Sequence, residues 1–144
     1  MRRRLHRLRD LSVPLSLPTA AIRERLNGDR QFLRAARGWE MKVRLGVGED
    51  DYLLEIDGGR VARFERGLDF FDSYAGSLAG TEDDWELLLR EVPPPFYQDF
   101  IGAWFRQGFT LAGDLESLFA YMDALRRMLE IMRQVRNGQE AVAG

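Results

Sequence analysis

The period of the hydrophobic pattern changes twice along this chain, and this change constrains the fold more than any other feature. Between residues 39 and 47, apolar side chains alternate strictly with polar residues or glycine, which predicts a half-buried β-strand. On both sides, in residues 19–37 and in most of 81–136, apolar residues recur every three to four positions, which predicts helices. A chain that passes from helices to strands and back favours an α+β fold.

Short connections separate the expected strands. Residues 52–56 and 60–66 predict the second and third strands. The Asp57-Gly58-Gly59 turn between them predicts a tight hairpin, because both glycines can take a positive φ. Residues 68–78 are expected to form a fourth strand, and the segment 108–113 is short and β-like. The first three or four strands should therefore form an antiparallel meander.

Residues that can cap helices mark where the helices should begin. Thr19, Asp29, Thr81 and Asp114 each precede a stretch with helical spacing, and their side chains can accept hydrogen bonds from first-turn N–H groups. A further helix should follow the three prolines at positions 93–95. The expected helical segments are 19–27, 29–37, 81–92, 96–107 and 114–136.

Residue types that many enzymes require are missing from the sequence. There is no cysteine, and His6 is the single histidine. This excludes disulfides, zinc ribbons, iron–sulfur clusters, thiol nucleophiles and, in a folded core, histidine-based triads. We expect no metal and no cofactor. The composition favours a binding role over an enzymatic one.

Residues 1–18 are expected to form a mobile basic leader. Polar residues and prolines interrupt its apolar runs, so it does not match a secretory signal. Contact with an anionic membrane, at about 1 kcal/mol per arginine, is one expectation for the leader, and a merely arginine-rich composition is the other. The arginines concerned are Arg2, Arg3, Arg4, Arg7 and Arg9.

The rest of the chain is expected to be one cytoplasmic domain, residues 19–137, with a frayed tail at 138–144. A length of 144 residues suits a single domain. The net charge of −2 argues against nucleic acid as a partner. The sequence leaves the oligomeric state open.

Four stretches resemble the sterol carrier protein 2 family: residues 39–47, 52–64 (YLLEIDGGRVARF), 72–89 (DSYAGSLAGTEDDWELLL) and 105–122 (FRQGFTLAGDLESLFAYM). The last resembles the family's aromatic–x–x–Gly strand, which closes on Gly-Asp and runs into the final helix. The chain departs from the family at Phe109, where a lysine is common, and in the aromatic-rich segment 93–104. The resemblance covers about residues 20–136.

The resemblance implies an α+β fold with a mostly antiparallel five-stranded sheet, covered on one face by helices. Between sheet and helices it implies an apolar cavity for sterols, fatty acids or acyl-CoAs. Strand alternation and helical spacing place eight side chains on inward faces, where they should line this cavity or form a plain packed core. They are Phe70, Tyr74, Trp85, Phe100, Trp104, Phe109, Leu111 and Met122.

Three functions remain open from the sequence. The first is non-catalytic binding or transfer of an apolar ligand, in which each buried methylene contributes about 0.8 kcal/mol. The second is an enzyme that uses the same cavity, with Asp72 near Tyr74 and Tyr97 as a general acid whose pKa burial would raise. The third is an interaction module whose aromatic helix, residues 96–105, docks a partner or a second copy.

Overall fold

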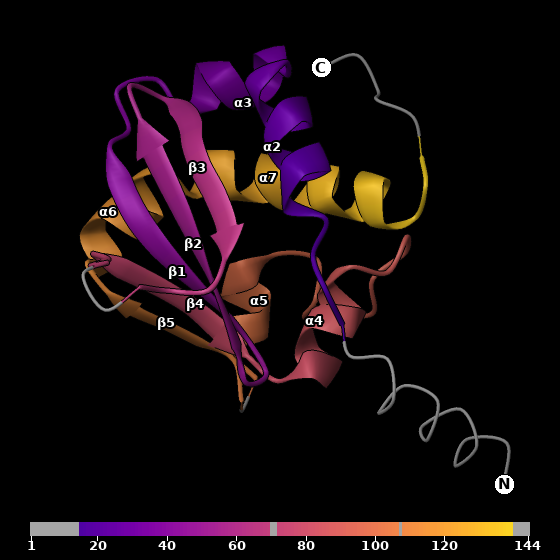
Figure 1. Cartoon of the computed structure of the whole chain (residues 1–144). Helices are drawn as coiled ribbons and strands as arrows, with labels where there is room; N and C mark the ends of the chain where they lie inside the picture. The colour runs from indigo at the N-terminus through magenta and orange to yellow at the C-terminus, as the bar shows by residue number, and fades with distance from the viewer. Residues whose placement is uncertain (1–14, 70–71, 107, 140–144) are drawn as a thin grey trace, which may run out of the picture.

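The computed structural model describes residues 15–69, 72–106 and 108–139, and in them helices lie over one face of a five-stranded sheet (Figure 1). In chain order the elements are α2 (Thr19–Asn27), α3 (Arg30–Ala35), β1 (Met41–Val47), β2 (Asp50–Asp57), β3 (Arg60–Arg66), β4 (Gly76–Gly80), α4 (Glu82–Leu88), α5 (Phe100–Trp104), β5 (Thr110–Gly113), α6 (Leu115–Ala120) and α7 (Met122–Arg136). The expected α+β class is confirmed.

The sheet is mixed, so the expectation of a mostly antiparallel sheet is corrected. Its strand order is β3-β2-β1-β4-β5. The pairs β1–β2, β2–β3 and β4–β5 are antiparallel, whereas β1 and β4 are parallel. The fourth strand therefore does not continue the meander at β3. It begins only at Gly76 and pairs with β1 on the edge opposite β2.

Helix α2 explains why the fourth strand does not add to β3. The Asn27 side chain accepts a hydrogen bond from the Val61 N–H at 2.8 Å and donates one to the Val61 carbonyl at 3.0 Å. Arg23 donates to the same carbonyl. Helix α2 thus occupies the outer edge of β3 at Val61, and β4 pairs with β1 instead. There Leu78 lies opposite Leu45, and both are fully buried.

The turn and most of the caps agree with the sequence. Gly58 and Gly59 take φ values of +60° and +75° in the β2–β3 hairpin. Asp29 and Asp114 accept hydrogen bonds from first-turn N–H groups of α3 and α6, and Thr81 forms a complete capping box at α4. Thr19 is the exception, because it is the first residue of α2 and Pro18 occupies the N-cap position.

Three of the expected helices differ clearly from the prediction. The helix expected over 81–92 ends at Leu88. The helix expected over 96–107 is reduced to α5, because Phe96 takes a φ of +76° and Asp99 caps a new start through a 2.8 Å bond from the Gly102 N–H. The helix expected over 114–136 breaks into α6 and α7 at Tyr121. Its ring stacks on Trp39 at 5.2 Å between centroids.

Residues 15–18 belong to the folded domain and not to the leader expected over 1–18. Leu15 and Leu17 are 4% and 5% exposed, and the Leu17 N–H donates to the Tyr52 hydroxyl at 3.0 Å. The arginines expected to contact a membrane lie outside the described residues, as do residues 140–144. At the other end, Arg25 donates to the Gln139 carbonyl, so the tail is attached to the domain at that point.

Candidate functional site

Three aromatic side chains from three segments meet beneath α4 and α5. The Trp85 ring lies 5.8 Å from Phe100 and 5.7 Å from Phe109, and the last two stack at 5.9 Å. All three are at most 3% exposed. The Trp85 indole N–H donates to the Gly46 carbonyl at 2.8 Å, which fixes the ring cluster to β1.

Local sequence explains why these rings converge. The Thr81 capping box starts α4 and sets the direction in which Trp85 points. A glycine is required at position 80, because a Cβ there would collide with the Phe109 ring. Phe109 comes directly before β5, which is hydrogen-bonded to β4. The ring cluster therefore packs between these short strands and the helices.

Beside the rings lies a buried polar pair. The Tyr97 hydroxyl donates to the Asp84 carboxylate at 3.0 Å, and the Thr81 N–H donates to the other carboxylate oxygen at 3.1 Å. Burial, and then the hydrogen bond to Asp84, raise the pKa of Tyr97. Both carboxylate oxygens of Asp84 are thus engaged in joining the 93–99 loop to the start of α4.

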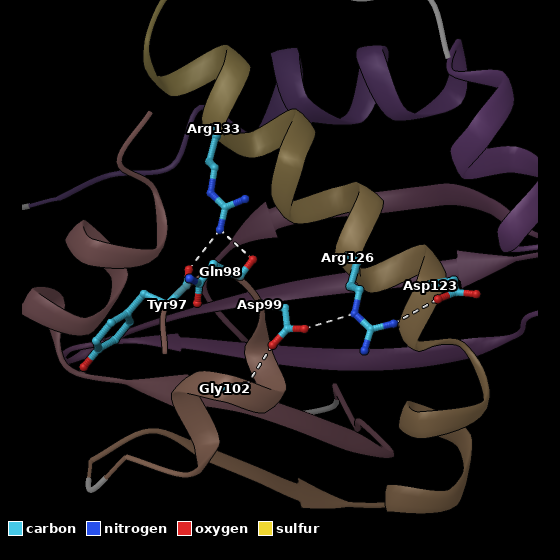
Figure 2. A network of polar contacts seen from close by, with 7 residues as sticks. All are labelled: Tyr97, Gln98, Asp99, Gly102, Asp123, Arg126 and Arg133. Atoms are coloured by element: carbon cyan, nitrogen blue, oxygen red, sulfur yellow. Dashed lines mark hydrogen bonds and ion pairs between the residues drawn. The ribbon is translucent and has the colours of Figure 1, made fainter. Parts of the chain in front are cut away.

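Arginines of α7 hold the loop before α5 in place (Figure 2). Arg133 donates to the carbonyls of Tyr97 and Gln98 at 2.9 and 2.8 Å, and also to that of Leu88 at 2.7 Å. Burial lowers the pKa of Arg133. Arg126 forms an ion pair with Asp99 at 3.1 Å. A loop without regular structure is therefore bound to the longest helix through the side chains of Arg133 and Arg126.

The structure brings some of the eight predicted lining residues together and separates others. Trp85, Phe100 and Phe109 form the ring cluster, while Leu111 and Met122 are buried in the same core. Trp104 is partly buried against the core and touches the rings of Phe105 and Phe119.

Tyr74 does not join this group, because its side chain is 46% exposed. The remaining predicted residue, Phe70, lies outside the described residues. That these side chains line a cavity stays a prediction.

Two of the open cavities among the described residues lie away from the ring cluster. One, of about 420 Å³, lies between α3 and α7 and is lined by Gln31, Arg34, Ala35, Asp123, Arg126, Arg127 and Glu130. The other, of about 480 Å³, lies along α2 and is lined by Ala20, Arg23, Glu24, Asn27 and Gly28. Most of these lining residues are polar or charged, and none of them is among the eight predicted residues.

Asp72 does not lie inside an apolar cavity, so its proposed role as a general acid is corrected. Its carboxylate accepts hydrogen bonds from the Asp69 N–H and from Arg63 of β3, each at 2.8–2.9 Å. These two bonds lower the pKa of Asp72, the opposite of the expected shift. Asp72 therefore lies beside the charged Arg63 of β3 and not in the apolar interior.

Sequence reasoning missed two features of the aromatic residues. Helical spacing places Phe119 in the buried stripe of the last helix, but it is 41% exposed because α6 ends before α7 begins. Trp39 is 1% exposed, and its indole N–H has no hydrogen-bond partner among the described residues. The stack of Trp39 on Tyr121 joins positions 82 residues apart in the sequence, which no local pattern indicates.

In structural class, this chain is an α+β domain with a mixed five-stranded sheet, helices on one face and an aromatic cluster between the layers. Solved structures identify this arrangement as the fold of sterol carrier protein 2. The crystal structure of sterol carrier protein 2 matches with a TM-score of 0.64 at 17% identity, covering 80% of this chain and 92% of that one. The expected resemblance is confirmed for the fold.

Two further structures agree with this result. A conserved hypothetical protein from Thermus thermophilus, described as possibly a sterol carrier protein and solved in solution, matches with a TM-score of 0.64 at 18% identity and covers 86% of this chain and 88% of its own. The apo form of Sterol Carrier Protein 2 from Yarrowia lipolytica matches with a TM-score of 0.50 at 13% identity, covering 79% and 88%. No family model matches the sequence, and no curated protein does.

Within the described residues, no helix is long and apolar enough to cross a membrane.

Proposed function

We propose that this protein binds, without catalysis, a lipid-type apolar ligand such as a sterol, a fatty acid or an acyl-CoA. The ligand would lie between the sheet and helices α4, α5 and α7. The observation that carries the proposal is the fold, which this chain shares over 80% of its length with a structure named as a sterol carrier protein. Transfer of the ligand to or from another lipid phase is part of the same proposal.

The side chains in this region suit a ligand of variable shape. Met122, Met128 and Met132 of α7 are all buried at no more than 4% exposure, and methionine side chains are flexible and polarizable. The ring cluster would supply aromatic side chains to the same ligand. Such a region can open around a ligand by changes of rotamer, while the backbone hydrogen bonds of the sheet stay intact.

Binding of this kind needs no reactive group. At about 0.8 kcal/mol per methylene, an acyl chain of about ten buried methylenes contributes about 8 kcal/mol before the cost of association. The buried carboxylates of Asp84 and of Asp29, the N-cap of α3, support binding over catalysis, because both already have hydrogen-bond partners within the protein. Asp84 is bonded to Tyr97 and Thr81, and Asp29 to Arg127 and the Phe32 N–H.

Native mass spectrometry of the purified chain, followed by displacement of a fluorescent fatty acid, tests the proposal. We expect a one-to-one complex and displacement by fatty acids or sterols at micromolar concentration. Absence of copurified lipid together with no saturable binding of the fluorescent fatty acid would contradict the proposal.

Trp104→Ala tests whether the site extends to α5. Trp104 is only partly buried, so its truncation should cost less stability than the roughly 3–5 kcal/mol typical of a core tryptophan. It should also shift preference toward bulkier ligands. Phe105→Ala is the matched control, because this neighbouring ring is 75% exposed and should leave ligand preference unchanged. A destabilised Trp104→Ala protein with unchanged preference would place Trp104 in the packed core only.

A further inference from the structure

The end of α5 presents aromatic side chains to the outside. Phe105 is 75% exposed, Phe96 is 50% exposed and Phe119 is 41% exposed. Together with the partly buried Trp104, we call these four residues the aromatic rim. Exposed apolar residues that occur singly need no explanation, but a contiguous group marks an interaction surface.

Ring contacts join three of the four rim residues, and the backbone places the fourth beside α5. Trp104 stacks on Phe105 at 6.3 Å and lies 5.8 Å from Phe119. Phe96 adjoins the same helix from the loop before it, because a Cβ on Gly102 would stand 2.7 Å from the Phe96 carbonyl oxygen. The rim therefore combines residues from the 93–99 loop, from the end of α5 and from α6.

One cation lies within the rim. The guanidinium carbon of Arg106 is 5.6 Å from the centre of the Phe96 ring and 5.9 Å from that of Tyr97, which is the distance of a cation–π contact. The Arg106 side chain is exposed. Aromatic rings beside an exposed arginine are the combination found at the boundary between lipid headgroups and acyl chains.

The size of the rim favours a lipid surface over a protein partner. The exposed parts of the three phenylalanines amount to roughly 300 Å², taking about 200 Å² for a whole side chain. A stable interface buries about 800 Å² on each partner. Insertion into a bilayer has no such requirement, because every apolar side chain that enters the acyl region contributes separately.

The rim also continues inward to the candidate ligand site. Helix α5 has five residues, and its opposite side carries Phe100 and Ala103, which are fully buried. Phe100 belongs to the ring cluster. A surface held by the rim would therefore lie next to a short helix whose buried side packs on the apolar interior.

We propose that the aromatic rim inserts into the surface of a phospholipid bilayer, with Arg106 at the level of the headgroup phosphates. The second step rests on the proposed function: the ligand site under α5 exchanges its ligand with that bilayer. The leader arginines are not needed for this contact.

Tryptophan quenching by vesicles of brominated phosphatidylcholine tests the docking step. Trp39 and Trp85 are at most 1% exposed, so quenching by brominated acyl chains reports Trp104. We expect quenching in the wild-type chain. The double variant Phe105→Ser/Phe119→Ser keeps Trp104 and should lose at least tenfold in vesicle affinity. Phe105→Ser alone, at the most exposed ring, should show the same trend if the double variant folds poorly.

Val92→Ser is the matched control, because Val92 is an apolar side chain 83% exposed and outside the rim. It should bind vesicles as the wild type does, and an equal loss in this variant would overturn the assignment to the rim. Arg106→Gln should weaken binding to vesicles that contain phosphatidylglycerol and should have a smaller effect with phosphatidylcholine alone.

Three other results would overturn the proposal. The first is vesicle binding without Trp104 quenching, which would assign membrane contact to another surface such as the leader. The second is a dimer in sedimentation that Phe105→Ser dissociates, which would assign the rim to self-association. The third is unchanged affinity in the double variant. Displacement of the fluorescent fatty acid in the absence of vesicles should be equal in all these variants, so failure of ligand binding and failure of docking are distinguished.

Discussion

The two halves of the sheet are built in different ways. Strands β1, β2 and β3 have seven or eight residues each. Strands β4 and β5 have five and four residues, and helices α4, α5 and α6 have seven, five and six. Elements this short are marginal by themselves. The second half therefore depends on tertiary contacts for its structure.

The polar contacts that hold each half to α7 also differ in strength. In the first half, Asp29 at the start of α3 forms a bidentate pair with Arg127 of α7, and both side chains are at most 9% exposed. In the second half, the 93–99 loop is held by Arg133 and by the more exposed pair of Asp99 with Arg126. We expect the first half to open only on global unfolding and the second to open locally.

Arg127→Ala should have the largest effect on stability. It leaves the Asp29 carboxylate buried without its guanidinium partner, a change that typically costs about 3–5 kcal/mol. Urea denaturation at neutral pH measures it. A loss below about 1 kcal/mol, the value of an exposed pair, would show that the buried Asp29–Arg127 pair holds the first half no more strongly than an exposed pair would.

The same pair predicts how stability depends on pH. The hydrogen bond from Arg127 is the main cause that lowers the pKa of Asp29. The stabilisation is therefore present above the ordinary aspartate pKa and is lost as the pH falls through the lowered value. Arg127→Ala should flatten the acid limb of the stability curve, and an unchanged slope would contradict this origin.

The two buried tryptophans give the next comparison. Trp85→Phe removes the buried 2.8 Å hydrogen bond from the indole N–H to the Gly46 carbonyl, so it should cost about 2–3 kcal/mol. Trp39→Phe removes an N–H that has no partner among the described residues, so it should cost about 1 kcal/mol or less. Thermal unfolding of both variants checks the difference. Equal losses would show that ring volume, and not the hydrogen bond, decides the cost.

Arg126→Gln should have the smallest effect on global stability, below about 1 kcal/mol, because its ion pair with Asp99 is partly exposed. Amide exchange should nevertheless become several-fold faster in residues 100–105 and stay unchanged in β1 to β3. Arg66→Gln is the matched control, because Arg66 forms an exposed pair with Asp50 in the first half. Faster exchange of α5 in the control as well would contradict the local role of Arg126.

Much of the fold could be predicted because its causes are local. The Asp57-Gly58-Gly59 hairpin follows from two residues that tolerate positive φ, and the predicted bounds of β3 are the observed ones. The capping roles of Asp29, Thr81 and Asp114 depend on groups three residues away. The inward positions of Trp85, Phe100 and Phe109 follow from periodicity, and these are the three predicted site residues whose rings meet.

The sequence by itself determined the class of fold, the first three strands and which faces are apolar, because φ preferences, caps and periodicity act over a few residues. Only the tertiary structure decided that β4 pairs with β1, since α2 occupies the edge of β3 through Asn27. It also decided that α6 and α7 separate at Tyr121, which stacks on the distant Trp39, and that Phe105 and Phe119 remain outside. These outcomes depend on contacts between segments far apart in the chain. The free energy of such contacts cannot be predicted from a short stretch of sequence.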